Sequence, residues 1–214
     1  MTDLDRDAEE LLRLGTATLY EASRSDLFLD PAFRPAWGGA QLVGRAFPVS
    51  AQLGDNLALH HGIESAGAGD VLVVDAGAGA YGYWGEVMTV AAQARGIHGL
   101  VIDGGVRDTA QLASLGFPAF STAISIRGTI KQWPGAVGAP ITLRGRVVRR
   151  GDVIVADRDG IVVIPAERYD EVLAASRERA VKEDAFMARL RAGETTLDVY
   201  DFRGLGEPIH GTDR

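Results

Sequence analysis

The feature that most constrains the fold is the alternation of helix-like and strand-like segments between residues 55 and 125. VLVVDA and GLVIDGG are continuous apolar runs, of the kind found in strands buried on both faces of a sheet. Helix-like segments precede, separate and follow them, which predicts parallel strands joined by helical crossovers. The next segment, residues 140–165, has short alternating strands broken by glycines, which predicts antiparallel hairpins. The chain is therefore expected to be a mixed α/β protein.

Helices are predicted at both ends of the chain. Residues 4–14 form a short amphipathic pattern, and Thr16-Ala-Thr18 offers an N-cap for a second short helix, LYEASR. A long charged helix is expected from Glu167 to about Arg191, followed by an irregular tail. Because no internal repeat, low-complexity tract or linker interrupts the sequence, residues 1–214 are expected to form one domain.

Composition and charge exclude several classes of protein. The chain has 214 residues, a net charge of −7 and no cysteine, so thiol nucleophiles, disulfides and zinc–thiolate sites are ruled out. An acidic chain lacks the basic face that nucleic-acid binding requires, and no apolar run approaches the length of a membrane span. The acidic, amphipathic N-terminus differs from a secretory signal. We expect a cytoplasmic protein whose partners include neither nucleic acid nor a membrane.

A glycine-rich segment, GAGAYG at residues 77–82, spells the dinucleotide-binding pattern G-x-G-x-x-G. A predicted strand precedes it, a helix follows, and Asp103 ends the next strand about twenty residues later, as that pattern requires. In dinucleotide-binding folds, however, the helix begins among the glycines, whereas here an aromatic segment intervenes and the helix is expected to begin near Gly85. We therefore favour a turn that needs small residues, and we interpret Asp103 as a turn residue too.

A stronger signal follows the glycines, where a predicted helix opens with Glu86, Val87 and Met88. Arg107 and Asp108 follow the strand GLVIDGG, with twenty residues between Glu86 and Arg107. Helix starts and the carboxyl ends of parallel strands share the edge of a sheet at which ligands bind, so these residues are expected to gather. The free amides of Val87 and Met88 would hold a small carboxylate, aided by the helix dipole.

The side chains at this edge suit a specific chemistry. Arg107 would reach the carbonyl oxygen of the same ligand, and Asp108 would hold a hard divalent cation such as Mg²⁺ or Mn²⁺, with waters completing the coordination. Glu86 would bind a metal-bound water or act as a base. The alternatives are structural: Glu86 as a favourable charge in the first turn of its helix, and Arg107-Asp108 as a surface pair that caps the next helix.

Several segments resemble one known family of enzymes. These segments are LGTATLYEASRSDLF, DNLALHHGIESAGAGDVLVVD, GYWGEVMTVAAQARGIHGLVIDGGVRDTAQLASLGFPAF, GTIK and GDVIVADRDGIVVIPAE. They are similar to the 4-hydroxy-4-methyl-2-oxoglutarate/4-carboxy-4-hydroxy-2-oxoadipate aldolases, which are class II, metal-dependent pyruvate aldolases related to the RraA regulators of RNase E. The resemblance runs from about residue 14 to the C-terminus. Its most specific element is an acid, twenty residues, then Arg-Asp; Glu86 and Arg107-Asp108 match it, with Glu where Asp also occurs in the family.

The resemblance implies a fold and an assembly. The expected fold is a layered α/β/β/α, swivelling-type (RraA-like) single domain with a C-terminal helical arm, assembled as a homotrimer or a dimer of trimers. Residues 166–214 would form the helix and tail that pack on a neighbouring subunit. Glu183 is the best match to a glutamate that the family places near the metal of an adjacent subunit, and its alternative is a residue of a solvated, charged arm.

The resemblance also implies a reaction and roles for individual residues. The reaction is retro-aldol cleavage of a 4-hydroxy-2-oxo acid to pyruvate and a second 2-oxo acid. Asp108 would anchor the metal, with Glu86 near its waters, and the amides of Val87 and Met88 would bind the pyruvate carboxylate. Arg107 would contact the pyruvoyl carbonyl and stabilise the enolate formed there. The same enolate arises when oxaloacetate loses carbon dioxide, so that activity is expected as well.

Four other residues are candidates whose roles stay open. Lys131 would pair with the distal carboxylate of the substrate, or it is an ordinary surface lysine. Asn56 would contact the substrate or cap its helix, for which Asp55 is the other candidate. His60 and its neighbour His61 would supply a base, or they simply follow the apolar pattern of their helix.

The alternative function is that of an RraA-like regulator, which inhibits RNase E by contact and needs no catalysis. Such regulators typically stop near the position of Ile164-Pro165, whereas this chain continues to residue 214 and carries Glu183. The added length favours the aldolase. The segment RDTAQL lacks an acid that some family members carry three positions after the Asp, so the identity of the 4-hydroxy-2-oxo acid stays open.

Overall fold

The computed structural model describes residues 3–206, and the chain divides into two compact units, Met1–Ser176 and Arg177–Arg214. The helices are α1 (Asp3–Ser23), α2 (Leu57–Ser65), α3 (Glu86–Ala94), α4 (Thr109–Ser114), α5 (Tyr169–Arg191) and α6 (Thr196–Val199), with 3-10 turns at Ala166–Arg168 and Arg203–Leu205. The strands are β1 (Arg34–Pro35), β2 (Leu42–Ser50), β3 (Asp70–Trp84), β4 (Gly99–Val106), β5 (Ala119–Ile124), β6 (Ala136–Val137), β7 (Ile141–Leu143), β8 (Arg146–Val148), β9 (Val153–Ala156) and β10 (Ile161–Ile164). Over residues 3–206, no helix combines the length and the apolar character needed to cross a membrane.

One mixed sheet organises the first unit. Its strands lie in the order β1-β5-β4-β3-β2-β9-β10, and β6 pairs with β2 outside this path. The pairs β2–β3, β3–β4 and β4–β5 are parallel, whereas β9 pairs antiparallel with both β2 and β10. A separate antiparallel hairpin joins β7 to β8. The predicted change from parallel crossovers to hairpins is therefore confirmed, as is the mixed α/β class.

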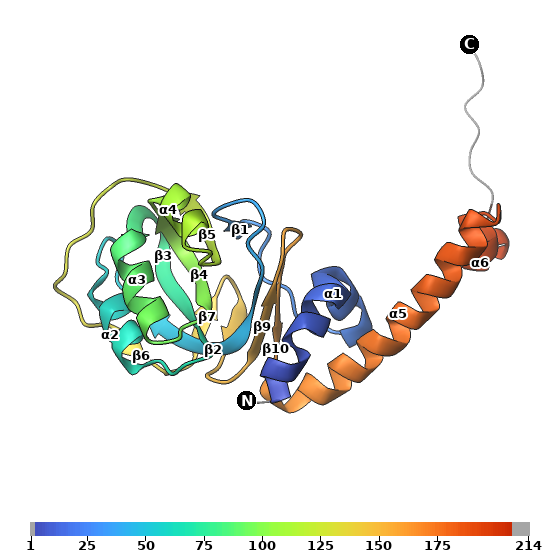
Figure 1. Ribbon diagram of the computed structural model, residues 1–214, viewed down its shortest axis with the longest axis horizontal. Helices are drawn as coiled ribbons and strands as arrows, with labels where there is room; N and C mark the ends of the chain where they lie inside the picture. Colours follow the sequence, from blue (N-terminus) through green and yellow to red (C-terminus); the bar gives the residue numbers. More distant parts are fainter. Residues whose placement is uncertain (1–2, 207–214) are drawn as a thin grey trace, which may run out of the picture. The chain divides into compact units, whose positions relative to one another are not determined.

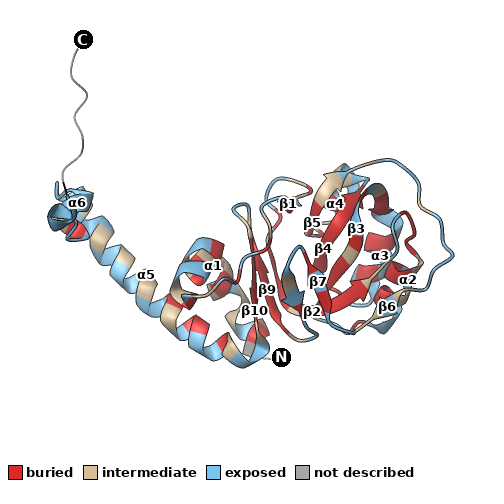
Figure 2. Cartoon of the chain, turned by 180° about the vertical axis from the view of Figure 1, so that it is seen from behind, coloured by how far each residue is buried: buried red, intermediate tan, exposed pale blue. Residues whose placement is uncertain are grey.

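The two faces of the sheet carry separate cores. Alternate residues of β3 point to opposite faces, so that Leu72 and Val74 belong to one apolar cluster and Val71 and Val73 to the other. The first cluster includes side chains of α2, α3 and α4, which cover one face of the sheet in Figure 1. The second includes side chains of the β7–β8 and β9–β10 hairpins. Figure 2 shows the central strands buried almost throughout, as a sheet covered on both faces requires.

Helix α1 contains the two short helices that the sequence predicts. They meet at Gly15, whose φ of 79° kinks the helix. The amide of Thr16 donates to Asp157 at 2.8 Å, and its hydroxyl donates to the same carboxylate at 2.7 Å. The N-cap expected within Thr16–Thr18 is thus supplied by an aspartate of the β9–β10 turn.

The glycine-rich segment is part of a strand. β3 continues through residues 77–82 and pairs irregularly with β4, so the predicted turn takes the form of a bulge within the strand, where Gly77 has a φ of 65° and Ala78 a φ of 55°. A Cβ added at Gly82 would lie 2.6 Å from the carbonyl oxygen of Ser125, and one at Gly79 would lie 2.5 Å from the Tyr83 hydroxyl. These glycines are needed for close packing against protein atoms. Because protein atoms occupy the space beside them, these glycines leave no room for a pyrophosphate, and we reject the interpretation of the segment as a dinucleotide-binding loop.

Asp103 is a buried ion-pair partner within β4, so the prediction of a turn at this residue is wrong. Arg144, from the β7–β8 turn, donates to both of its carboxylate oxygens at 2.9 and 3.0 Å. The carboxylate raises the pKa of Arg144 by hydrogen bonding, against an opposing effect of burial. This pair fastens the hairpin to the sheet.

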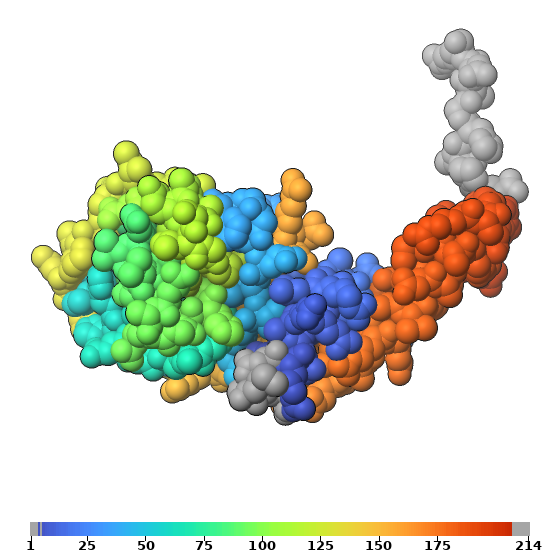
Figure 3. Space-filling view, in the orientation of Figure 1, coloured from blue at the N-terminus to red at the C-terminus, as the bar shows by residue number. Residues whose placement is uncertain are grey.

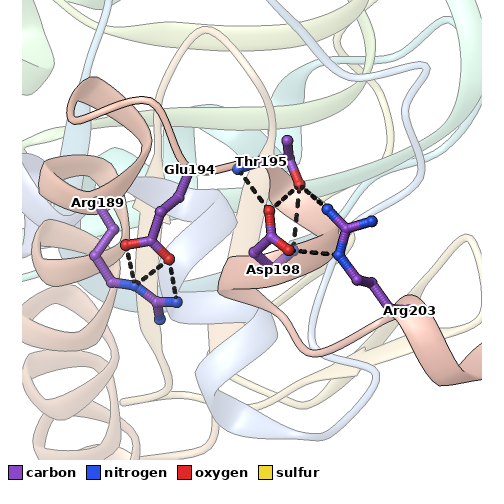
Figure 4. Close-up of polar contacts among 5 residues, drawn as sticks. All are labelled: Arg189, Glu194, Thr195, Asp198 and Arg203. Atoms are coloured by element: carbon purple, nitrogen blue, oxygen red, sulfur yellow. Dashed lines mark hydrogen bonds and ion pairs between the residues drawn. The ribbon is translucent and has the colours of Figure 1, made fainter.

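The second unit contains the end of α5 and the short helix α6. Arg189 pairs with Glu194, Thr195 and Asp198 form a capping box at the start of α6, and Arg203 binds Asp198 (Figure 4). The hydrogen bond from Arg203 lowers the pKa of Asp198 well below its usual range. These contacts are exposed, so each stabilises the unit only weakly. Packing of residues 166–214 on a neighbouring subunit stays a prediction, and residues 207–214 lie outside the described part of the chain.

Candidate functional site

The predicted site residues meet where β3 and β4 end side by side. Trp84 of β3 pairs with Val106 of β4, and the amide of Arg107 donates to the Trp84 carbonyl at 2.9 Å. Helix α3 begins two residues after Trp84, at Glu86. The start of α3 and the end of β4 are therefore adjacent, as the strand–helix alternation predicts.

Asp108 turns back toward α3 instead of capping its own helix. Its backbone is left-handed, with φ 55° and ψ 38°, and it occupies the N-cap position of α4 without a side-chain cap bond. Its carboxylate accepts a hydrogen bond from the amide of Glu86 at 3.0 Å. A Cβ at Gly85 would overlap that carboxylate. The proposed cap of the next helix is thus wrong, and Gly85 is a site residue that the sequence analysis did not single out.

Two amides at the start of α3 are free to bind an anion. Within residues 3–206, the N–H groups of Val87 and Met88 have no hydrogen-bond acceptor, and the bond from Thr89 to Gly85 is the first of the helix. The Val87 side chain is 82% exposed. Unpaired amides and the positive end of the helix dipole favour a carboxylate at this position.

Arg107 lies beside these amides with its guanidinium half-exposed. Its Nε is 3.8 Å from the Asp108 carboxylate, which is too long for a hydrogen bond. An exposed pair at this distance contributes little to stability. The N–H groups of the Arg107 guanidinium are therefore available to a ligand. One oxygen of the Asp108 carboxylate accepts from the Glu86 amide, and the other oxygen does not.

A cavity of about 210 Å³ brings most of the candidate residues together. It is lined by Asn56, His60, Tyr83, Gly85, Val87, Met88, Arg107, Asp108 and Lys131. Figure 3 shows α3 and α4 side by side on the surface of the first unit. Two of the sequence candidates in this unit, Glu86 and His61, do not line the cavity, although the Glu86 amide donates to Asp108. The cavity suits a small metabolite with one or more carboxylates.

Asn56 carries an unsatisfied acceptor at the wall of the cavity. The residue is only 5% exposed, and its Nδ2 donates to the Tyr83 carbonyl at 3.0 Å. Its Oδ1 has no hydrogen-bond donor within the described residues. Asn56 does not cap α2, because that bond runs from the Leu57 amide to Asp55, at 2.8 Å. A buried acceptor without a donor is costly, and because the Oδ1 atom is itself enclosed by protein, it faces no open part of the cavity.

His60 and Lys131 form the outer part of the same wall. Burial lowers the pKa of His60, and the positive charges of Lys131 and His61 lower it further. His60 is therefore neutral near pH 7 and able to accept a proton. His61 does not line the cavity and lies 3.9 Å from Glu64.

The candidate carboxylates for a divalent metal are Asp108, which lines the cavity, and Glu86, which adjoins it through its amide but does not line the cavity. Among residues 3–206, no group of three His, Cys, Asp or Glu side chains could enclose an ion. Asp108, with Glu86 beside it, fits Mg²⁺ or Mn²⁺, which bind through one or two carboxylates and keep several waters. Glu183 lies in the second unit, where Arg179 Nε is 2.7 Å from its carboxylate. Its role at a metal stays a prediction.

The fold and the cavity define an α/β protein with a candidate small-anion site where two parallel strands of its mixed sheet end. A family model described as "RraA-like: Aldolase/RraA" matches residues 16–163, and the chain belongs to this family. A relative from Halalkalibacterium halodurans, named "Putative 4-hydroxy-4-methyl-2-oxoglutarate aldolase", is 34% identical over 73% of this chain and 75% of its own length. These matches confirm the family resemblance.

Two solved structures share the fold. An uncharacterized protein from Pseudomonas syringae pv. tomato has a TM-score of 0.80 and 29% identity, covering 93% of this chain and 92% of its own. RraAS2 from Streptomyces coelicolor, described as an unusual member of the RNase ES inhibitor RraA protein family, has a TM-score of 0.75 and 26% identity, covering 89% and 98%. The chain is thus similar both to a relative named as a putative aldolase and to a member of an RNase inhibitor family.

Proposed function

We propose that the chain is a divalent-metal-dependent pyruvate aldolase of the cytoplasm. It would cleave 4-hydroxy-4-methyl-2-oxoglutarate or 4-carboxy-4-hydroxy-2-oxoadipate to pyruvate and a second 2-oxo acid. The observation that supports this best is the convergence of two unpaired amides, Arg107 and Asp108 on one small cavity. The name of the Halalkalibacterium halodurans relative agrees with it.

The start of α3 and Arg107 would hold the pyruvoyl half of the substrate. The amides of Val87 and Met88 bind its C1 carboxylate, which places the C2 carbonyl toward Arg107. When the C3–C4 bond breaks, its electron pair moves onto the C2 oxygen as an enolate. Arg107 stabilises that negative charge more strongly than it stabilises the neutral carbonyl, which is the condition for catalysis.

Asp108 and Glu86 are the residues that would hold the metal. A bound Mg²⁺ or Mn²⁺ supplies Lewis-acid stabilisation of the same oxygen. Asp108 is fixed for this role by the Glu86 amide and by the absence of a side chain at Gly85. Glu183 of an adjacent copy is the third candidate.

The opposite wall would bind the other half of the substrate. Lys131 pairs with a distal carboxylate, and Asn56, which lines the same wall, contacts the substrate near C4. Neutral His60 is the cavity side chain able to take the hydroxyl proton as the C4 oxygen becomes a carbonyl. Because oxaloacetate yields the same enolate on losing carbon dioxide, we propose decarboxylation as a secondary activity.

A homo-oligomer, either a trimer or a dimer of trimers, is part of the proposal. Large apolar side chains are exposed close to the site: Val87 is 82% exposed, Ile124 65% and Ile126 90%. Ile124 pairs with Val106, the residue before Arg107. Exposed apolar side chains beside a site favour a subunit interface there, and such an interface would bring a second copy to the cavity.

The second candidate function is an RraA-like protein-binding regulator. It is favoured by the likeness to the Streptomyces coelicolor protein described in terms of RNase ES inhibition. The cavity distinguishes the two functions, because inhibition by contact does not require paired ligand donors in a cavity.

The test is pyruvate release from 4-carboxy-4-hydroxy-2-oxoadipate, with and without Mg²⁺. We expect release that requires Mg²⁺ and falls at least about a hundredfold in Asp108→Ala, because the metal anchor is lost. Asp159→Ala removes an exposed carboxylate in the β9–β10 turn and should retain activity. A folded wild-type chain that releases no pyruvate would favour the regulator.

A further inference from the structure

Lys131 lies on a connection that has no regular structure of its own. Residues 125–135, which we call the 125–135 segment, link β5 to β6 and contain one isolated bridge, between Ile130 and Asp55. A lysine on such a segment would be mobile unless the backbone were held from outside. How the segment is held therefore determines where the Lys131 ammonium can lie.

Asp55 holds the backbone directly after Lys131. Its Oδ2 accepts hydrogen bonds from the amides of Gln132, at 2.7 Å, and Trp133, at 2.9 Å. Its Oδ1 accepts the bond from the Leu57 amide that caps α2. The Asp55 carboxylate, 2% exposed, thus joins the start of α2 to the 125–135 segment.

The backbone before Lys131 is held by the neighbours of Asp55. The amide of Ile130 donates to the Gly54 carbonyl at 2.9 Å, and the amide of Asn56 donates to the Ile130 carbonyl at 3.1 Å. Lys131 therefore sits between two clamped positions. The same short stretch, 54–56, places Asn56 and Lys131 at one wall of the cavity.

The beginning of the segment has its own anchor and does not depend on Asp55. The amide of Gly82 donates to the Arg127 carbonyl at 2.8 Å, and the Arg127 guanidinium lies 4.0 Å from the centre of the Tyr81 ring. Ser125 Oγ donates to the Ala80 carbonyl at 2.8 Å. Loss of Asp55 should release the part that carries Lys131 while this anchor keeps the rest in place.

Electrostatics support the same arrangement. Burial raises the pKa of Asp55, but the amides of Leu57, Gln132 and Trp133, together with the charge of Lys131, outweigh burial and leave the pKa below its ordinary value. Asp55 is therefore ionised at neutral pH. It binds the segment as a charged acceptor, and such hydrogen bonds are stronger than neutral ones.

We propose that Asp55 is a positioning residue that fixes Lys131 at the cavity and thereby sets selectivity for substrates with a carboxylate beyond C4. The inference rests on the proposed aldolase function. A preorganised ammonium binds a distal carboxylate without the ordering cost that a mobile lysine would incur. Substrates whose distal half carries no charge gain nothing from this preorganisation.

The test compares two substrates in Asp55→Asn. Asparagine keeps an acceptor for Leu57 but offers a donor group to the amides of Gln132 and Trp133. For 4-carboxy-4-hydroxy-2-oxoadipate we expect KM to rise about tenfold. For a 4-hydroxy-2-oxo acid with an uncharged tail, KM and kcat should stay as in wild type. Lys131→Met should reproduce this selective loss, and adding Asp55→Asn to Lys131→Met should change nothing further.

Two additional measurements guard against a folding defect. Gln132→Pro removes one donor to Asp55 without touching α2, and it should show the same selective rise in KM. Amide hydrogen exchange should become faster at Gln132 and Trp133 in Asp55→Asn, and stay slow at Gly82. Equal losses on both substrates, or a further loss in the double variant, would overturn the positioning role. A wild-type chain inactive on both substrates would instead contradict the proposed function, and the selectivity role with it.

Discussion

The two walls of the cavity are assembled in different ways. The α3 wall, formed by Gly85, Val87, Met88, Arg107 and Asp108, arises from the adjacent ends of two parallel strands. The α2 wall, formed by Asn56, His60 and Lys131, depends on a long-range clamp between Asp55 and the 125–135 segment. The first wall has its geometry set by the sheet. The second is held by a few hydrogen bonds to a segment without regular structure, so it is the wall in which selectivity can change without loss of the fold.

The substitution expected to disrupt the α3 wall most is Gly85→Ala. The new Cβ would overlap the Asp108 carboxylate and displace it, and a shift of about 1 Å at a reacting group lowers activity about a hundredfold. Pyruvate release measured at saturating Mg²⁺ checks this. Gly38→Ala is the matched control, because its Cβ would meet nothing within 4 Å. Full activity in Gly85→Ala would show that the position of Asp108 does not matter.

Val87 separates the role of a backbone amide from that of a side chain. Val87→Pro removes the N–H proposed to bind the pyruvate carboxylate, at a helix position that tolerates proline. We expect KM to rise about tenfold, as for the loss of one hydrogen bond to a charged group. Val87→Ala keeps the amide and removes only an exposed side chain, so its KM should match wild type. Equal behaviour of the two variants in steady-state kinetics would contradict carboxylate binding at this amide.

The role of His60 in the α2 wall should be measurable in the pH dependence of kcat. Since the pKa of His60 lies below its ordinary value, the neutral base persists to a lower pH than in a free histidine and is lost only below that lowered pKa. Lys131→Met removes one of the charges that lower the pKa of His60, so the acid limb of kcat should move to higher pH. Lys182→Met, in the second unit, should leave the limb in place. An unchanged limb in Lys131→Met would count against His60 as the base.

The α3 wall could be predicted because general rules of sheet topology place its residues. The apolar runs of β3 and β4 indicated parallel strands, and parallel strands bring Glu86 close to Arg107 and Asp108. What could not be predicted was the left-handed backbone of Asp108, which aims its carboxylate at α3. The spacing of residues does not encode that angle.

The α2 wall and the glycine segment show where sequence patterns fail. The contacts of Asp55 with Gln132 and Trp133 join positions far apart in the chain, and no local pattern indicates them. Gly77 and Gly79 resemble turn glycines. Gly77 does have a positive φ, in a bulge of β3, whereas the missing side chain of Gly79 serves close packing within the strand. Asp103 resembles a turn residue because two glycines follow it, and no local pattern indicates its partner, Arg144, which lies 41 residues later.

The central claim is that the α3 wall stabilises an enolate of pyruvate, and exchange of the pyruvate C3 protons into heavy water tests it without the second half of the substrate. Proton NMR with Mg²⁺ should show loss of the methyl signal with wild type and with Lys131→Met, because pyruvate has no distal carboxylate. Arg107→Ala should abolish the exchange, since the charge on the C2 oxygen loses its partner. Exchange that survives in Arg107→Ala, or that is absent from folded wild-type protein with Mg²⁺, would contradict the account.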